Sequence, residues 1–217
     1  MSTVASPYGL RPVGTVGGNA AYTGGTARAF RLTADNTVAI YANGPVTMAA
    51  GAVNGIGASG TAGTPSVNIA LGVCTGIQYT DPVMKYTLFA QYLPVNSITA
   101  GYTNIIVFVN DDPDALFQIQ GAGPVTATLA QAQAKIGWNA ALTFASATVP
   151  GNATTGLSSV SLTAPANTDN LMMRVVDIVN QSSISGGYPQ SPSDTYPEYI
   201  VKWNFGAHIY HNHGVNV

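Results

Sequence analysis

Short blocks of apolar residues alternate with turn-forming residues along most of this chain. Within the blocks, Val, Ile, Leu, Phe and Tyr recur at every second position or in runs of a few residues, which is typical of half-buried or sandwiched strands. The predicted strands cover residues 28–32, 38–42, 45–49, 67–79, 84–93, 105–110, 116–120, 125–129, 158–163, 171–180 and 198–205. Many short strands separated by Gly- and Pro-containing turns predict an all-β protein with a β-sandwich or barrel-like fold.

The N-terminal region departs from this pattern. Residues 1–27 are rich in Gly, Pro, Ala and Thr and show no periodicity, so we predict an extended N-terminal arm ahead of a β-rich body, residues 28–217. Within the body, residues 51–66 predict a long flexible loop, and Asn43-Gly44-Pro45 predicts a tight turn. Residues 93–104 are the best place for a boundary between two small β subdomains.

At most one short helix is predicted, over residues 128–142. Ala and Gln favour helix, and Leu129, Ala132 and Ile136 would share one helical face. Gly137 interrupts the stretch, which limits the length of any helix.

Charged residues are scarce, at 7% of the chain, and the net charge is −2. A chain with this balance has no electrostatic attraction for nucleic acid or an anionic membrane surface. The strongly apolar run Ile105–Val109 is too short to span a bilayer, and the N-terminus lacks the pattern of a secretory signal. We therefore expect synthesis in a cytoplasm. Either a coat of small polar residues keeps the protein soluble, or neighbours in an assembly cover much of its surface.

Few residues suit catalysis. Cys74 is the only cysteine, which excludes an intramolecular disulfide, and its apolar surroundings predict a buried thiol. The run Asp111–Asp114 suits a turn better than a calcium loop, with Asp112-Pro113 setting the geometry and Asp114 accepting hydrogen bonds from backbone amides. No nucleophile elbow or paired carboxylates stand out. We predict that the protein is not an enzyme and uses no cofactor.

All three histidines lie near the end of the chain, as His208, His211 and His213. In a strand, His211 and His213 would share a face, which is an incomplete tetrahedral site. A symmetric trimer would bring six such nitrogens to one axial metal ion, a geometry suited to an octahedral ion. The plainer interpretation, which we adopt, is a strand edge without a metal.

Several segments, taken in order, resemble tailed-bacteriophage virion proteins of the capsid decoration, or cement, family. These segments are YGLRPV (8–13), VNDDPDALFQIQ (109–120), IGWNAAL (136–142) with GNATTGLSSVSL (151–162), and EYIVKWNFGAHIYHNHG (198–214). The segment 109–120 is the most similar. The resemblance implies β-rich subunits on the outer capsid surface, often trimeric, which tie neighbouring capsomers together without a catalytic residue or cofactor.

From this resemblance we expect a virion protein on the capsid surface, assembled in the host cytoplasm, with the major capsid protein as partner and a homotrimeric state. The arm would contact the adjoining subunit through Tyr8, Leu10, Arg11 and Pro12, and its deletion (residues 2–13) would weaken shell binding but leave the core folded.

Two other functions stay open. One is a receptor- or glycan-binding module of the virion surface, such as a head fibre or tail spike, in which tyrosines and Trp203 stack on sugars. The other is a metal-dependent enzyme that uses the histidines.

Overall fold

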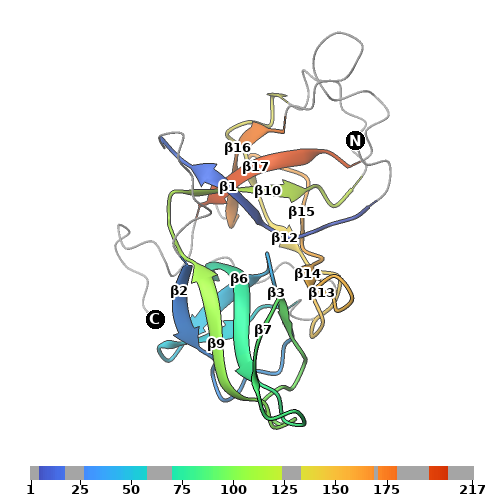
Figure 1. Ribbon diagram of the computed structural model, residues 1–217. Helices are drawn as coiled ribbons and strands as arrows, with labels where there is room; N and C mark the ends of the chain where they lie inside the picture. Colours follow the sequence, from blue (N-terminus) through green and yellow to red (C-terminus); the bar gives the residue numbers. More distant parts are fainter. Residues whose placement is uncertain are drawn as a thin grey trace.

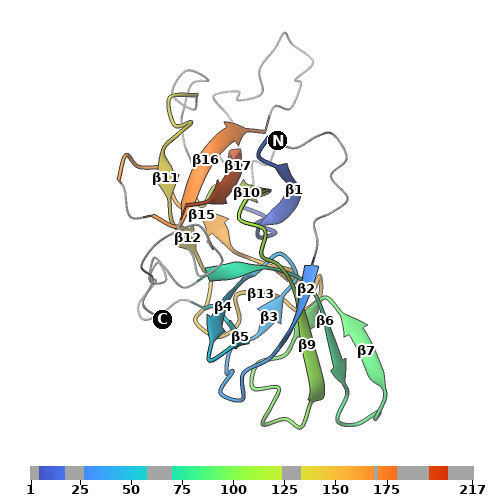
Figure 2. The same ribbon diagram turned by 90° about the vertical axis from the view of Figure 1, so that its left-hand side faces the viewer.

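The computed structural model describes residues 5–17, 27–57, 70–123, 133–168, 171–179 and 196–204. The described residues form antiparallel sheets and contain no helix, so the all-β prediction is confirmed. Figure 1 shows two β-rich halves, one above the other, and Figure 2 shows them after a quarter turn.

The upper half is built around a five-stranded sheet, called the upper sheet below. Its strands, in spatial order, are β1 (Arg11–Thr15), β10 (Ala115–Gln120), β17 (Glu198–Trp203), β16 (Met173–Ile178) and β11 (Asn139–Ala140). A two-stranded sheet of β12 (Leu142–Thr143) and β15 (Ser161–Leu162) contributes Leu142 and Leu162 to the same core. The upper half is therefore sandwich-like.

The lower half is a strongly curled sheet, called the lower barrel below. Its strands, in spatial order, are β2 (Ala27–Arg31), β9 (Thr103–Asn110), β6 (Ala70–Thr80), β4 (Pro45–Ala49) and β5 (Ala52–Gly55). The two edges meet where Leu32 bridges Val53 and the Thr33 amide donates to the Val53 carbonyl at 2.9 Å. A further strand, β7 (Thr87–Ala90), pairs with the far end of β6.

Two small sheets complete the described fold. β3 (Ile40–Tyr41) pairs with β8 (Tyr92–Leu93), and β13 (Gly151–Asn152) pairs with β14 (Leu157–Ser158). A bridge between Ala42 and Leu157 joins these two sheets. A late segment of the chain is thereby held against an early one.

Alternation of buried and exposed residues explains the strands of the upper sheet. In β10, Ala115, Phe117 and Ile119 are fully buried, whereas Leu116 and Gln118 are partly exposed. One face of the strand therefore packs on the core, as the period-two pattern predicts. In β17 the same alternation buries three residues, Tyr199, Val201 and Trp203.

The two halves share apolar contacts. Each has its own cluster of buried side chains, but Ile56, which follows β5, and Ala70 and Val73 of β6 belong to the upper cluster. The first five residues of β6 are all buried, which is the uninterrupted apolar pattern of a strand covered on both faces. Burial of this shared surface couples the two halves.

Two of these strands, β1 and β5, were not predicted from the sequence. Part of the predicted arm forms β1, and part of the predicted loop 51–66 forms β5, joined to β4 by a tight turn in which Ala50 and Gly51 have positive φ. The strand β1 owes its conformation to pairing with β10 rather than to its own composition.

The predicted boundary and helix also differ from the structure. Residues 93–104 connect β8 to β9, whereas the chain crosses from the lower barrel to the upper sheet at residues 111–114. Of the predicted helix 128–142, the part up to 132 lies outside the described residues, and Asn139, Ala140 and Leu142 are in strands. Pairing of β11 with β16 overrides local helix propensity here.

Candidate functional site

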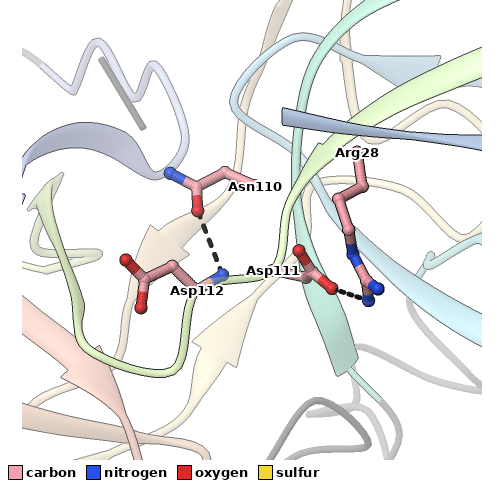
Figure 3. A network of polar contacts seen from close by, with 4 residues as sticks. All are labelled: Arg28, Asn110, Asp111 and Asp112. Carbon is pink, nitrogen blue, oxygen red and sulfur yellow. Dashed lines mark hydrogen bonds and ion pairs between the residues drawn. The ribbon is translucent and has the colours of Figure 1, made fainter. Parts of the chain in front are cut away.

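The aspartate-rich run forms the junction between the two halves (Figure 3). Asp111 forms an ion pair with Arg28 of β2, and Asn110 Oδ1 accepts a 3.2 Å hydrogen bond from the Asp112 amide. Asp112 Oδ1 in turn accepts a 2.9 Å hydrogen bond from the Asp114 amide. The predicted turn is confirmed, but the carboxylate that accepts from the backbone belongs to Asp112, not to Asp114.

Asp114 connects the junction to two strands of the upper sheet. Its carbonyl accepts a 2.8 Å hydrogen bond from the Val16 amide, just beyond β1, and its carboxylate lies 3.7 Å from the Lys202 ammonium of β17. Among the described residues, no three His, Cys, Asp or Glu side chains are placed to share a metal ion. The polar groups of the junction contact β2 of the lower barrel on one side and the ends of β1 and β17 of the upper sheet on the other, and so help to fix the orientation of the two halves.

The N-terminal segment is part of the core. Leu10 is fully buried within the upper cluster, and its amide donates a 2.8 Å hydrogen bond to the Asn43 carbonyl. Gly9 adopts a positive φ of 80°, and a Cβ there would collide with the carbonyl oxygen of Asn43. Deletion of residues 2–13 would take away a core side chain and most of β1, so we now expect it to destabilise the folded core rather than to leave it intact.

The four predicted partner-binding residues differ in exposure. Leu10 is buried in the chain's own core, while Tyr8 and Pro12 are partly buried. Burial, together with the nearby Glu198 carboxylate, raises the pKa of Tyr8 well above its usual value, so its hydroxyl stays protonated. Arg11 is exposed and is the one member of the four that is broadly presented to solvent.

The most exposed apolar feature of the described residues is the turn after β6 together with β7, residues 81–90, called the apolar hairpin below. Val83 is 84% exposed, Met84 61%, Tyr86 51% and Phe89 75%. Figures 1 and 2 show its turn at the end of the lower barrel that lies away from the upper sheet. Together the four residues expose on the order of 500 Å² of mainly apolar surface, in the upper part of the range of about 300–600 Å² for the largest patch of a monomer, which is often functional.

Local hydrogen bonds fix the shape of the apolar hairpin. Asp81 Oδ1 accepts 2.8 Å hydrogen bonds from the amides of Val83 and Met84, and the Asp81 amide donates to the Tyr86 carbonyl at 3.1 Å. Lys85 has a positive φ of 61°. These contacts favour one conformation of the apolar tip, which lowers the entropic cost of binding.

Alternation along β7 explains why an aromatic residue lies outside. Leu88 and Ala90 pack against the lower core, whereas Phe89 points away and stacks on Phe108 of β9, with ring centroids 6.5 Å apart. A strand is predicted over residues 84–93, but the sequence pattern does not distinguish the exposed face of this strand. The apolar cluster VMKY directly after Asp81-Pro82, a turn signal, is the pattern that could have found it.

The structure bears on the predictions for Trp203 and Cys74, but not on those for the three histidines. Trp203, expected to stack on sugars, is buried in the upper core and packs edge-on against Phe117, so it is not available to a glycan. Cys74 is buried as expected, and burial raises the pKa of its thiol to about 12. His208, His211 and His213 lie outside the described residues.

Comparisons with known proteins give no relative. No protein-family model, no curated protein and no solved structure matches this chain. None of the described residues belongs to a helix long and apolar enough to cross a membrane. A proposal for the function can therefore draw only on the sequence itself and on the surface that the structure describes.

Proposed function

We propose that this protein is a structural component of a tailed-phage virion that decorates the outer capsid surface and cements neighbouring capsomers. The observation that carries the proposal is the apolar hairpin, a preformed apolar projection on a chain with very few charges. The sequence resemblance to decoration proteins gives the kind of partner, which is the major capsid protein. In this proposal the apolar hairpin, rather than the N-terminal arm, supplies the main contact.

The size of the apolar hairpin supports binding through several copies. Burial of about 500 Å² of apolar surface contributes about 12 kcal/mol before costs. Lost rotational and translational freedom offsets much of this, so one hairpin alone gives weak binding. Three hairpins in a homotrimer would act at high effective concentration, which converts weak contacts into stable attachment. We therefore include the homotrimer in the proposal.

The structure provides a direct test through exposed side chains. The combined substitution Val83→Thr, Met84→Thr and Phe89→Thr removes most of the apolar hairpin's exposed apolar surface and keeps β-compatible residues. Ile98→Thr and Val149→Thr, at 37% and 40% exposure elsewhere on the surface, are the matched control. Each protein is mixed with decoration-free capsids of the phage that encodes it and sedimented.

We expect the hairpin variant to lose capsid binding by at least about tenfold, because it lacks the central contact. The control variant should bind like the unchanged protein. Both should keep their thermal unfolding midpoints within a few degrees, since exposed sites contribute little to stability. Full capsid occupancy by the hairpin variant would refute the assigned contact, and absence of binding by the unchanged protein would refute the decoration role.

A further inference from the structure

A groove of about 620 Å³ opens beside the junction, between the ends of β1 and β17 and the start of β16. Its lining includes two cations, Arg174 and Lys202, one acid, Asp114, and several apolar side chains, of which Val16 and Ile136 are the exposed ones. The apolar hairpin is on the lower barrel, so the groove is a separate surface. The role of these residues is not explained by the junction alone.

The two cations are placed against each other. Arg174 of β16 lies directly opposite Lys202 of β17 in the strand register. Like charges at directly opposed positions destabilise a sheet, and the chain has only seven Lys and Arg residues with which to form such a pair. An anion bound between the two side chains would offset this repulsion.

Within the described part of the chain, only one carboxylate lies close to the two cations. The Asp114 carboxylate is 3.7 Å from the Lys202 ammonium and its side chain is 64% exposed, so the pair is weak. Arg174 forms no ion pair within the described part of the chain. Two positive charges thus face one loosely held negative charge in an open groove.

The groove also has exposed apolar side chains on its walls, so it can contact apolar as well as charged groups. Val16 and Ile136 remain 45% and 41% exposed on its walls. A site with two cations and exposed aliphatic side chains suits a ligand that carries both carboxylates and apolar groups. An extended acidic peptide has this combination, because its side chains alternate in direction.

We infer that this groove binds an extended acidic segment of a partner protein, with a carboxylate between Arg174 and Lys202 and an aliphatic side chain against Val16 and Ile136. Nucleic acid fits less well, because Asp114 at the rim and the net charge of −2 oppose a dense polyanion. The inference depends on the groove alone and holds whether or not the protein decorates a capsid.

The test uses the full chain and a fluorescein-labelled peptide of alternating Leu and Glu, followed by fluorescence anisotropy. A peptide of alternating Leu and Gln and a labelled DNA duplex serve as comparison probes. The protein variants are Arg174→Gln with Lys202→Gln, and the control Arg31→Gln, an exposed cation of β2 outside the groove.

We expect the Leu/Glu peptide to bind the unchanged protein and the control equally, and the double variant at least about tenfold more weakly, as loss of a charge-assisted contact predicts. The Leu/Gln peptide should bind as weakly as the Leu/Glu peptide binds the double variant. In the free protein, Arg174→Gln should keep or raise the thermal midpoint at low salt, because it removes a like-charge contact. A cation with a purely structural role would instead lower it.

Equal peptide binding by the double variant would overturn the inference, and so would a failure of the unchanged protein to bind the Leu/Glu peptide at about 1 mM. Tighter binding of the DNA duplex than of the peptide, lost in the double variant, would overturn it in favour of a phosphate site.

Discussion

Replacement of Leu10 by alanine tests whether the N-terminal segment is part of the core. Leu10 is fully buried among the side chains of the upper cluster. The substitution removes three carbon atoms, which costs about 2.4 kcal/mol in transfer free energy at about 0.8 kcal/mol for each. The cavity left behind adds to this, and measured Leu→Ala substitutions in cores cost about 2–5 kcal/mol.

We expect Leu10→Ala to lower the free energy of unfolding by about 3 kcal/mol, in the lower part of that range. The site lies just before the edge strand β1, so its surroundings can partly collapse into the space. The matched control is Val13→Ala in β1, where the side chain is 37% exposed and the expected loss is below about 1 kcal/mol.

Urea unfolding followed by tryptophan fluorescence measures both variants. Trp203 is a suitable reporter because it lies in the same core as Leu10. The reasoning is refuted if Leu10→Ala destabilises the protein no more than Val13→Ala does. A chain that lacks residues 2–13 and still unfolds at the same urea concentration as the full chain would refute it equally.

Three further predictions concern buried polar and titratable groups. The Cys74 thiol, with a pKa raised to about 12 by burial, should react with a thiol reagent at pH 8 only after unfolding; rapid reaction of the folded protein would contradict its burial. Burial raises the pKa of Tyr199 from 10.0 to about 12, so the unfolded chain loses this proton first and the free energy of unfolding should fall as the pH rises from about 10 to about 12. Tyr199→Phe should flatten that decline in urea titrations, and an unchanged slope would speak against it. Arg28→Gln leaves the Asp111 carboxylate buried without its ion pair and should cost about 1–3 kcal/mol; a change below about 0.5 kcal/mol in urea unfolding would show that the pair contributes little.

The strands that could be predicted are those whose pattern is local. Residues 45–49 match β4, and 116–120 differ from β10 by one residue, because one-sided burial leaves a period-two pattern in the sequence. The strand β1 could not be found in this way. Its sequence RPVGT contains Pro and Gly, and its conformation comes from pairing with β10, a hundred or more residues away.

The candidate sites were predictable only in part. The turn at Asp111–Asp114 has a local signal, since Asx and Pro residues encode it directly. Its role as the crossing between the two halves depends on sheet topology, which no local pattern reports. The groove likewise depends on the register between β16 and β17, which sets Arg174 opposite Lys202. A local sequence pattern does not report this register.

Function is the least predictable level, because exposed apolar residues look like core residues in a sequence. Val and Phe are residue types that usually lie in buried strands, and only the fold shows that Val83 and Phe89 are exposed to solvent. The scarcity of charged residues left two explanations for how the protein stays soluble, a coat of small polar residues or coverage by neighbours in an assembly. The apolar hairpin supports the assembly.

The most direct test of the proposed phage origin and decoration role is the copy number of this chain in purified virions of a phage whose genome carries its gene. Quantitative mass spectrometry against the major capsid protein measures it. Decoration of the shell predicts a copy number comparable with that of the major capsid protein. A few copies per particle, as for a fibre or spike, or absence from the virion, would contradict the account.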